Sequence, residues 1–294
     1  MRKLEYQPNL YARSLAGDRS YLVGLLFDDP QGDYLSGMQR GAMRQCRQYG
    51  YHVVVEVFNQ ATTLDQIKSF LTKLSLSGVI LTPPVCDNKV VLAALADRNI
   101  PTVRISPSKP FHGMVDIKID DYKAATLMTE HLIALGHKDI GFIIGDLEHA
   151  DANERYRAFN NCMENAGLTV NSDWVAQGSY LFESGLAASR KILSQEKKPT
   201  AIFASNDDMA AAALVVADEY GLSVPDDLSV AGFDDIPLAS AVSPALTTMR
   251  QPVETMAMIA VEQLVKLKKG DSPLQIPLVM DVTFVQRHST TTAP

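Results

Sequence analysis

The sequence of 294 residues contains only three cysteines, Cys46, Cys86 and Cys162, and none of them lies in a C-x-x-C pair. An odd and scattered set does not make a disulfide framework, so we expect free thiols packed in the core. No run approaches the roughly 18–20 consecutive apolar residues of a membrane-spanning helix, and no apolar secretory signal follows Met1. These absences predict a cytoplasmic protein that does not span a membrane.

The motifs that anchor common enzyme chemistries are also missing. No G-x-G-x-x-G follows a strand-like run, no G-x-x-x-x-G-K-[ST] occurs, and no G-x-S-x-G elbow is present. His131 and His137 are six residues apart, which makes them a poor metal pair, and we expect them at helix caps or on the surface. The sequence therefore predicts no enzyme, no catalytic residues, no metal and no cofactor.

Positive charge is scarce over most of the chain. The net charge is −7, which gives the body no overall attraction for nucleic acid. Residues 1–19 differ, because they carry four basic and two acidic side chains. The basic amino-terminal segment on an acidic body indicates a local function for that segment.

The chain is rich in regularly spaced apolar residues. Hydrophobic residues make up 46% of it, and its length suits two domains. After residue 20, short runs typical of strands alternate with amphipathic helices, and most of these runs are continuously apolar, as strands covered on both faces should be. The expected strands are 21–27, 52–58, 78–81, 102–105, 115–119, 140–144, 200–204 and 229–233.

Local signals mark several helix ends. Apolar residues spaced three and four apart from Leu35 to Tyr49 predict one helix, and a second such pattern runs through 125–135. Gly50 and Gly167 stand where C-terminal caps are needed, and Asp65 is a candidate N-terminal cap. Strand–helix alternation throughout predicts the α/β class, with parallel sheets wound by helices on both faces.

Two comparable strand–helix series, 20–135 and 136–250, predict two similar lobes with a cleft between their carboxyl edges. Polar clusters follow three of the expected strands, at 28–29, 205–208 and 234–235. Asp207-Asp208 and Asp234-Asp235 are candidates for a divalent ion or for acid–base work. Because no nucleophile or third ligand group accompanies them, we favour hydrogen-bond acceptors for a polar ligand.

Several longer motifs resemble one known family. Residues 4–17 (LEYQPNLYARSLAG) resemble the end of the DNA-binding headpiece and the hinge helix of lactose-repressor/galactose-repressor family regulators. Residues 131–141 (HLIALGHKDIG), 204–210 (ASNDDMA), 230–235 (VAGFDD) and 243–248 (SPALTT) resemble the core of the same family. The motifs occur in the family's order, and the likeness covers essentially the whole chain.

The resemblance implies a periplasmic-binding-protein-like type I fold, in which two doubly wound parallel-sheet lobes are joined by crossovers. It divides the chain into a headpiece end and hinge helix (1–19), an N-terminal lobe (20–135 plus 252–278) and a C-terminal lobe (136–251 plus 279–294). It also implies a homodimer formed through the N-terminal lobe. The Ser/Thr-rich end of the chain is expected to be loose.

The resemblance further implies a DNA-binding transcriptional regulator, expected to repress a carbohydrate-utilisation operon. Its core would bind a sugar or sugar derivative, although family members also bind nucleosides and purines, and cleft closure would be relayed to the hinge helices. Only the tail of the family's helix-turn-helix headpiece is present here, so we expect this chain to bind its effector but to recognise an operator poorly.

The hinge segment begins at Pro8 and stops at Gly17, a length too short for a helix that is stable alone. By the resemblance, Leu15 enters the minor groove of operator DNA and kinks it; the alternative is that Leu15 packs on the body. The other positions expected near DNA are Arg13, Asn9, Ala12 and Tyr6.

The resemblance assigns effector contacts to particular residues of the core. Arg155 would grip two ligand oxygens with its planar fork, Asp234 would accept from ligand hydroxyl or NH groups, and Tyr180 would cover one ligand face. Arg157 is the rival of Arg155. The remaining expected effector-binding residues are Asn206, Gln251, Asp28, Asp29 and Tyr34. This set suits a carbohydrate, because hydroxyl groups need paired donors and acceptors.

Two other classes of protein remain as alternatives. A solute-binding protein of a sugar transport system shares the two-lobe architecture, but it should carry a secretory signal and no hinge helix. A cytosolic α/β enzyme acting on sugars through Asp207 or Asp234 would need a nucleophile, cofactor loop or metal set that the sequence does not show.

Overall fold

The computed structural model describes residues 20–28, 32–59, 61–274 and 276–294. The hinge positions Leu15, Arg13, Asn9, Ala12 and Tyr6 and the expected effector residue Asp29 lie outside the described residues. The described chain forms two compact units. Unit 1 contains 20–28, Leu35–Lys118 and Val253–Leu278, and unit 2 contains Gly32–Tyr34, Ile119–Pro252 and Val279–Pro294.

Unit 1 is built on a sheet whose described strands follow the order β11-β5-β4-β3-β1-β2. Strands β1 to β5 pair in parallel, with β1 between β2 and β3. This order is typical of doubly wound sheets, in which right-handed crossovers place helices on both faces. The strands are β1 (Leu22–Phe27), β2 (His52–Val57), β3 (Gly78–Leu81), β4 (Thr102–Ile105), β5 (Val115–Ile119) and β11 (Leu278–Met280).

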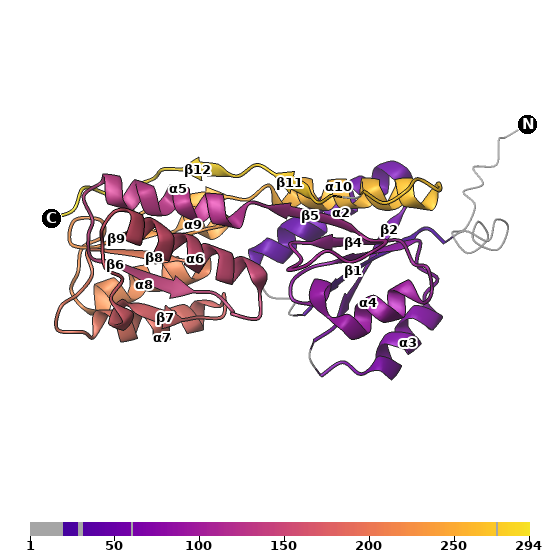
Figure 1. Cartoon of the computed structure of the whole chain (residues 1–294), viewed down its shortest axis with the longest axis horizontal. Helices are drawn as coiled ribbons and strands as arrows, with labels where there is room; N and C mark the ends of the chain where they lie inside the picture. The colour runs from indigo at the N-terminus through magenta and orange to yellow at the C-terminus, as the bar shows by residue number, and fades with distance from the viewer. Residues whose placement is uncertain (1–19, 29–31, 60, 275) are drawn as a thin grey trace, which may run out of the picture. The chain divides into compact units, whose positions relative to one another are not determined.

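Helices cover both faces of the unit 1 sheet (Figure 1). On one face, α2 (Asp33–Tyr49) packs beside α10 (Val253–Lys268), and on the other lie α3 (Leu64–Lys73) and α4 (Lys89–Ala96), with the short 3-10 helix η1 (Val85–Asp87) before α4. Gly41 permits the close approach of α2 to α10, because a Cβ at that position would overlap the carbonyl oxygen of Glu254.

The amino terminus of α3 corrects one expectation. Thr63 rather than Asp65 caps the helix, since its Oγ1 accepts a hydrogen bond from the Gln66 backbone N–H at 3.3 Å. The Gln66 Oε1 in turn accepts from the Thr63 N–H at 2.7 Å, which completes a capping box. Asp65 lies in the first turn, where its negative charge interacts favourably with the positive end of the helix dipole.

Unit 2 is built on a parallel sheet with the order β7-β6-β8-β9 in the described residues. Its strands are β6 (Ile140–Ile144), β7 (Val175–Gln177), β8 (Ala201–Ala204) and β9 (Ser229–Ala231). Strands β10 (Thr248–Arg250) and β12 (Thr283–Val285) form a separate antiparallel pair. The predicted α/β class with parallel sheets is therefore confirmed in both units.

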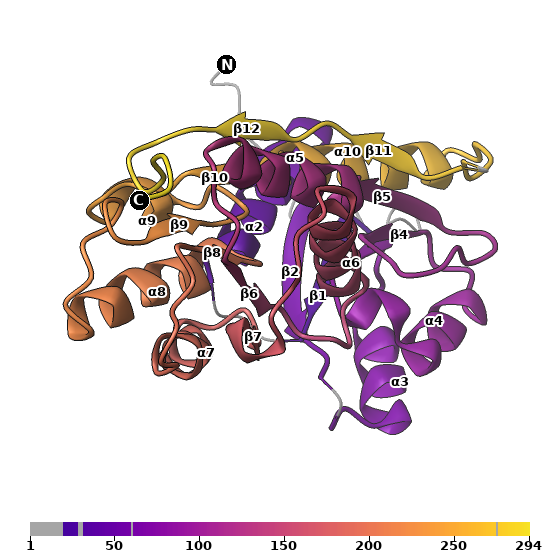
Figure 2. The same ribbon diagram turned by 60° about the vertical axis from the view of Figure 1, so that its left-hand side comes forward.

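The helices of unit 2 also lie on both faces of its sheet, as Figures 1 and 2 show. On one face, α5 (Asp121–Ala134) packs against α6 (Ala150–Asn165), and on the other, α7 (Phe182–Leu193) packs against α8 (Asp207–Glu219). The unit also contains the short helices η2 (Ser172–Trp174) and α9 (Pro237–Ala241). Because α5 packs on α6, it belongs to unit 2, whereas the predicted lobe boundary after residue 135 had assigned it to the first lobe.

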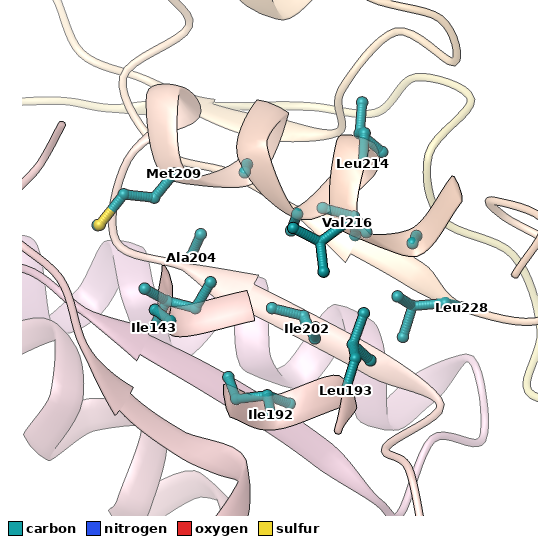
Figure 3. Close-up of a cluster of buried hydrophobic side chains, with 14 of the residues drawn as sticks. Ile143, Ile192, Leu193, Ile202, Ala204, Met209, Leu214, Val216 and Leu228 are labelled. Atoms are coloured by element: carbon teal, nitrogen blue, oxygen red, sulfur yellow. The ribbon is translucent and has the colours of Figure 1, made fainter. Parts of the chain in front are cut away.

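An apolar core joins the sheet of unit 2 to α7 and α8 (Figure 3). Ile143 of β6 and Ile202 of β8 contact this core from the sheet, while Ile192 of α7 and Val216 of α8 enter it from the helices. All four side chains are fully buried. This packing fixes the strand ends from which the polar loops of unit 2 emerge.

The carboxyl-terminal segment is not loose, contrary to the expectation from its composition. Ser289 is fully buried, its carbonyl oxygen accepts from the Val230 N–H at 2.7 Å, and its hydroxyl donates to the Val230 carbonyl at 2.5 Å. The Thr291 N–H donates to Ser229 Oγ at 3.0 Å. The hydroxyl and backbone groups of this segment thus extend the hydrogen bonding of β9.

The two histidines expected at caps or on the surface have other environments. His137 is buried, with its Nε2 3.0 Å from the Thr291 carbonyl oxygen and its Nδ1 2.9 Å from Thr200 Oγ1. His131 is half-buried, and its Nε2 lies 3.2 Å from Thr290 Oγ1. Both rings therefore hold structural hydrogen bonds to the end of the chain.

Other expectations of the sequence agree with the fold. Cys46, Cys86 and Cys162 are buried free thiols, as expected. Gly50 and Gly167 follow helices with φ of 74° and 69°, the left-handed conformation of a C-terminal cap. Within the described parts of the chain, each helix falls short of the combination of length and apolar character that crossing a membrane requires.

Candidate functional site

The candidate site lies at the carboxyl edge of the unit 2 sheet. The loops after β6, β7, β8 and β9 lead directly to the polar residues predicted from the sequence. Because parallel strands end at the same edge of a sheet, these loops converge there, which is the usual ligand position of such folds. Helix α6 contributes its first two turns to the same edge.

Arg155 is the centre of this site and is only 2% exposed. Its Nη2 lies 2.8 Å from Asp121 Oδ1 and 3.3 Å from Asp151 Oδ2, and its Nη1 lies 3.9 Å from Asp234 Oδ1. Its Nη1 also donates to the Ser205 carbonyl oxygen at 2.6 Å. Three carboxylates therefore surround one guanidinium group, and we call these four side chains the Arg155 cluster.

The planar fork of Arg155 does not point two free donors at a ligand. Its Nε donates to Asp121 Oδ1 at 2.9 Å, the same oxygen that Nη2 contacts. The guanidinium carbon lies 3.8 Å from the centroid of the Phe233 ring, which covers one face of the group. Most N–H donors of Arg155 are thus occupied inside the protein. The oxygens of the surrounding carboxylates can still accept hydrogen bonds from a ligand.

Asp234 has a specialised backbone and environment. Its φ is 108°, a strained conformation for a residue other than glycine, and the Gln251 side chain donates to its Oδ1 at 2.6 Å. Burial raises the pKa of Asp234 to about 7, against the opposing effects of Arg155 and the Gln251 hydrogen bond. Asp234 can therefore accept or donate a hydrogen bond near neutral pH. The Gln251 hydrogen bond favours the ionised form of Asp234.

Two other aspartates support the loop that carries Asp234. Asp235 accepts from Arg250 Nε at 2.5 Å and from Arg287 Nη2 at 2.6 Å. Asp207 is fully buried and accepts from Thr248 Oγ1 at 2.6 Å, and burial raises its pKa well above the usual range. These ion pairs and hydrogen bonds hold the loop that carries Asp234 against its neighbours.

Asn206 caps helix α8. Its Oδ1 accepts from the Met209 N–H at 3.0 Å, and its Nδ2 donates to the Tyr180 carbonyl oxygen at 2.8 Å. The amide group is thereby occupied at both ends, so its clear role is to connect the loop after β7 to the start of α8. It lies at the same sheet edge as the Arg155 cluster.

Tyr180 also belongs to this edge, in the loop between β7 and α7. Its φ is 64°, and its ring stands over Gly145, where any Cβ would overlap the ring. The His149 ring lies 5.4 Å from it, centroid to centroid. Its hydroxyl group is buried without a hydrogen bond to any described residue. Burial, and then the negative charge of Asp151, raise the pKa of this hydroxyl well above 10.

The remaining predicted residues have different positions. Tyr34 groups with unit 2, and burial, followed by the charges of Asp234 and Asp151, raises the pKa of its hydroxyl. Asp28 follows β1 in unit 1 and is half-buried. Arg157, the rival of Arg155, is exposed and pairs with Glu154 on the same helix.

Sequence reasoning missed several members of the site. Asp151 precedes Arg155 by one helical turn, and this i,i+4 spacing was a usable signal. Asp121 begins α5 and gave no such signal, because it lies far from Arg155 in sequence. The Phe233 ring and the Ser205 carbonyl were equally hidden, since only the fold brings them to the guanidinium group. Within the described residues, no His, Cys, Asp or Glu cluster could hold a metal ion.

Comparison with known proteins adds a second kind of observation. The family described as "Periplasmic binding protein-like domain" matches residues 129–290. The HTH-type transcriptional repressor PurR of Yersinia enterocolitica is 33% identical over 300 residues, which cover all of this chain and 87% of that protein. The relatives found in this way are transcriptional repressors, not enzymes.

Solved structures agree with these sequence relatives. The transcriptional regulator CelR, in complex with cellobiose, superposes with a TM-score of 0.85 and 25% identity, over 97% of this chain and 86% of that one. The lac repressor dimer, bound to operator and the anti-inducer ONPF, gives a TM-score of 0.83 and 26% identity, over 98% of this chain and 100% of that one.

Proposed function

This chain belongs to the lactose-repressor/galactose-repressor family of transcriptional regulators, and on that premise we propose that unit 2 binds a small carbohydrate effector. Its relatives are repressors with an effector-binding core, and our proposal concerns the chemical class of the effector. We further propose that the protein controls a carbohydrate-utilisation operon from the cytoplasm and that it binds without turnover.

One observation supports a carbohydrate most strongly: three carboxyl groups of the Arg155 cluster lie at the same sheet edge as Tyr180, whose hydroxyl pKa is raised by burial and then by the nearby charge of Asp151. Sugar hydroxyls donate well to carboxylates, and the C–H face of a sugar ring packs on an aromatic plate. Gln251, whose side chain donates to Asp234, adds an amide to the same edge. Among the solved relatives, CelR is described in complex with cellobiose, a disaccharide.

We propose that effector occupancy is relayed to the amino-terminal segment 1–19 in a homodimer. In this proposal Leu15 enters the operator minor groove, with Arg13, Asn9, Ala12 and Tyr6 near the DNA. A coupling free energy of about 1–3 kcal/mol between the two sites would change operator affinity by roughly 5- to 150-fold. Tyr34, Asn206 and Asp28 remain proposed effector contacts.

A thermal-shift panel tests the ligand class. The panel contains ribose, glucose, galactose, cellobiose and trehalose, each with a phosphate ester, together with adenine, guanine and hypoxanthine. We expect a sugar to raise the melting temperature, and at a hundredfold excess over Kd the stabilisation would be about 2.7 kcal/mol. Chromatography should return that sugar unchanged. Stabilisation by a nucleobase alone would contradict the carbohydrate assignment.

A matched pair of arginine variants tests the site. Arg155→Ala should weaken binding of the sugar that responds in the panel by at least tenfold in calorimetry, because it releases three buried carboxylates from their shared partner. Arg157→Ala, two residues away and exposed, should leave the affinity within twofold. Since Arg155→Ala also lowers stability, Arg155→Lys provides a variant that keeps the charge but loses the planar geometry. Equal affinities for all four proteins would exclude the Arg155 cluster as the site.

A further inference from the structure

The charge balance of the Arg155 cluster bears on which kind of carbohydrate it can accept. Arg155 is the one cation within salt-bridge distance of Asp121 and Asp234 among the described residues. Asp151 has one additional neighbour, the imidazole of His149 at 4.0 Å, which is positive only when protonated. Three buried or nearly buried aspartate side chains therefore face a single fixed positive charge, and burial raises the pKa of Asp121 to about 6 and that of Asp234 to about 7.

The donors of that positive charge are already occupied. Arginine usually binds a phosphate or carboxylate through two parallel N–H groups, most often Nε together with one Nη. In this structure both Nε and Nη2 bind Asp121 Oδ1, and Nη1 donates to the Ser205 carbonyl oxygen. The face of the guanidinium is covered by Phe233. No free fork remains for an anionic ligand group.

Further negative charge lies at the same end of unit 2. Burial, followed by the negative charges of Asp33 and Glu183, raises the pKa of Asp208 to about 6. The opposing arginines, Arg250 and Arg287, are bound to Asp235 at 2.5 and 2.6 Å and do not neutralise the cluster. An anion entering this edge would meet carboxyl groups, and the Arg155 donors that could bind it are already bound inside the protein.

We infer that the effector is an uncharged carbohydrate and that the Arg155 cluster excludes phosphate esters and sugar acids of the same skeleton. This inference rests on the proposed function and narrows it. The carboxylates accept hydrogen bonds from ligand hydroxyls, whereas a phosphate dianion offers only acceptors at neutral pH and is repelled. Specificity thus arises from repulsion of the charged analogue as well as from attraction of the neutral one.

Calorimetry with matched pairs tests the inference. The probes are ribose and ribose 5-phosphate, glucose and glucose 6-phosphate, and trehalose and trehalose 6-phosphate, together with the phosphate ester of any other sugar that responds in the thermal-shift panel. For the sugar that binds, we expect the ester to bind at least tenfold more weakly. An ester that binds as tightly as its parent sugar, or more tightly, overturns the inference and leaves the carbohydrate assignment intact. Failure of every sugar and every ester to bind contradicts the proposed function and the inference together.

A variant pair identifies the source of the discrimination. Asp151→Asn removes one negative charge from the cluster while keeping the shape of the side chain, so the affinity ratio between sugar and ester should fall at least threefold. Glu154 lies on the same helix, where it is exposed and pairs with Arg157. Glu154→Gln should therefore leave the affinity ratio between sugar and ester unchanged. If Asp151→Asn and Glu154→Gln give the same ratio as the unmodified protein, the cluster does not exclude the ester. Melting temperatures of both variants report whether they remain folded.

Discussion

At the scale of single residues, Arg155 illustrates how a charged side chain becomes a buried structural centre. Removing a guanidinium from water is costly unless carboxylates and hydrogen-bond acceptors replace the lost hydration. Asp121, Asp151 and the Ser205 carbonyl provide this replacement. The family resemblance favoured Arg155 over Arg157 as the effector-binding arginine, and only the fold showed which carboxylates surround Arg155.

Tyr180 leads to a prediction in which stability and affinity change in opposite directions. Its hydroxyl is buried without a partner among the described residues, so Tyr180→Phe removes an unsatisfied polar group and should leave the melting temperature unchanged or raise it. If this hydroxyl bonds the effector, the same substitution should weaken binding of the responding sugar by about 5- to 10-fold. Thermal unfolding and calorimetry on one protein sample measure both effects.

Tyr122→Phe is the matched control for this substitution. The Tyr122 hydroxyl accepts a hydrogen bond from Asn161 Nδ2 at 2.9 Å, so its removal should lower stability modestly and leave sugar affinity unchanged. If Tyr180→Phe binds the sugar as well as the unmodified protein does, the hydroxyl makes no effector contact and Tyr180 contributes its ring alone.

At the scale of secondary-structure elements, periodicity predicted the long elements well and short ones poorly. The strands at 78–81, 102–105, 115–119 and 140–144 were predicted with their observed bounds. The first and last of them are continuous apolar runs, as fully buried strands are, whereas the other two include charged residues. Strands β7, β10, β11 and β12 have only three residues each and were missed. Such short strands exist because a neighbouring strand pairs with them, and no local pattern carries that information.

The packing of α2 on α10 supplies a prediction at this scale. Gly41→Ala should lower the free energy of unfolding by about 1–3 kcal/mol, because the new methyl group overlaps the backbone carbonyl of Glu254. Gly37→Ala should cost less, since its nearest neighbour is a Val253 methyl group at 3.1 Å, which is side chain rather than backbone. Alanine's higher helix propensity favours both variants equally. Urea unfolding compares the two variants. Equal losses of stability would show that the close contact between Gly41 and the Glu254 backbone does not determine the cost of the substitution.

At the scale of the whole molecule, the end of the chain is bound to distant parts of unit 2. Ser289 joins β9, and Thr291 connects Ser229 to His137, which lies just before β6. Composition alone suggested a loose Ser/Thr-rich tail. Hydroxyl groups can remain in water or satisfy buried backbone groups equally well, and the choice depends on the partners that the fold presents.

His137 makes the stability of this arrangement depend on pH. Burial lowers its pKa below 6.5, although the hydrogen bond to the Thr291 carbonyl opposes this shift. Because the folded-state pKa lies below the unfolded-state value, the stabilisation by neutral His137 is complete above pH 6.5. It is lost progressively as the pH falls below 6.5 towards the folded-state pKa.

Comparison with His137→Gln isolates this contribution from the carboxylates that titrate nearby. Glutamine retains hydrogen-bonding groups but cannot be protonated in this range, so the stability advantage of the unmodified protein should shrink between pH 7.5 and pH 5.5. Urea unfolding at both values measures the difference. A constant advantage across this range would mean that His137 does not gain a proton on unfolding.

The sequence by itself determined the α/β class, most long strands and helices, the family and the positions of its principal polar loops. These properties follow from apolar periodicity, from caps and from motifs that are contiguous in the chain. Only the tertiary structure decided which carboxylates neutralise Arg155, that Asn206 serves as a cap, and that the carboxyl terminus is buried. Those outcomes depend on contacts between residues far apart in sequence, where burial and the available hydrogen-bond partners determine the role of each polar group.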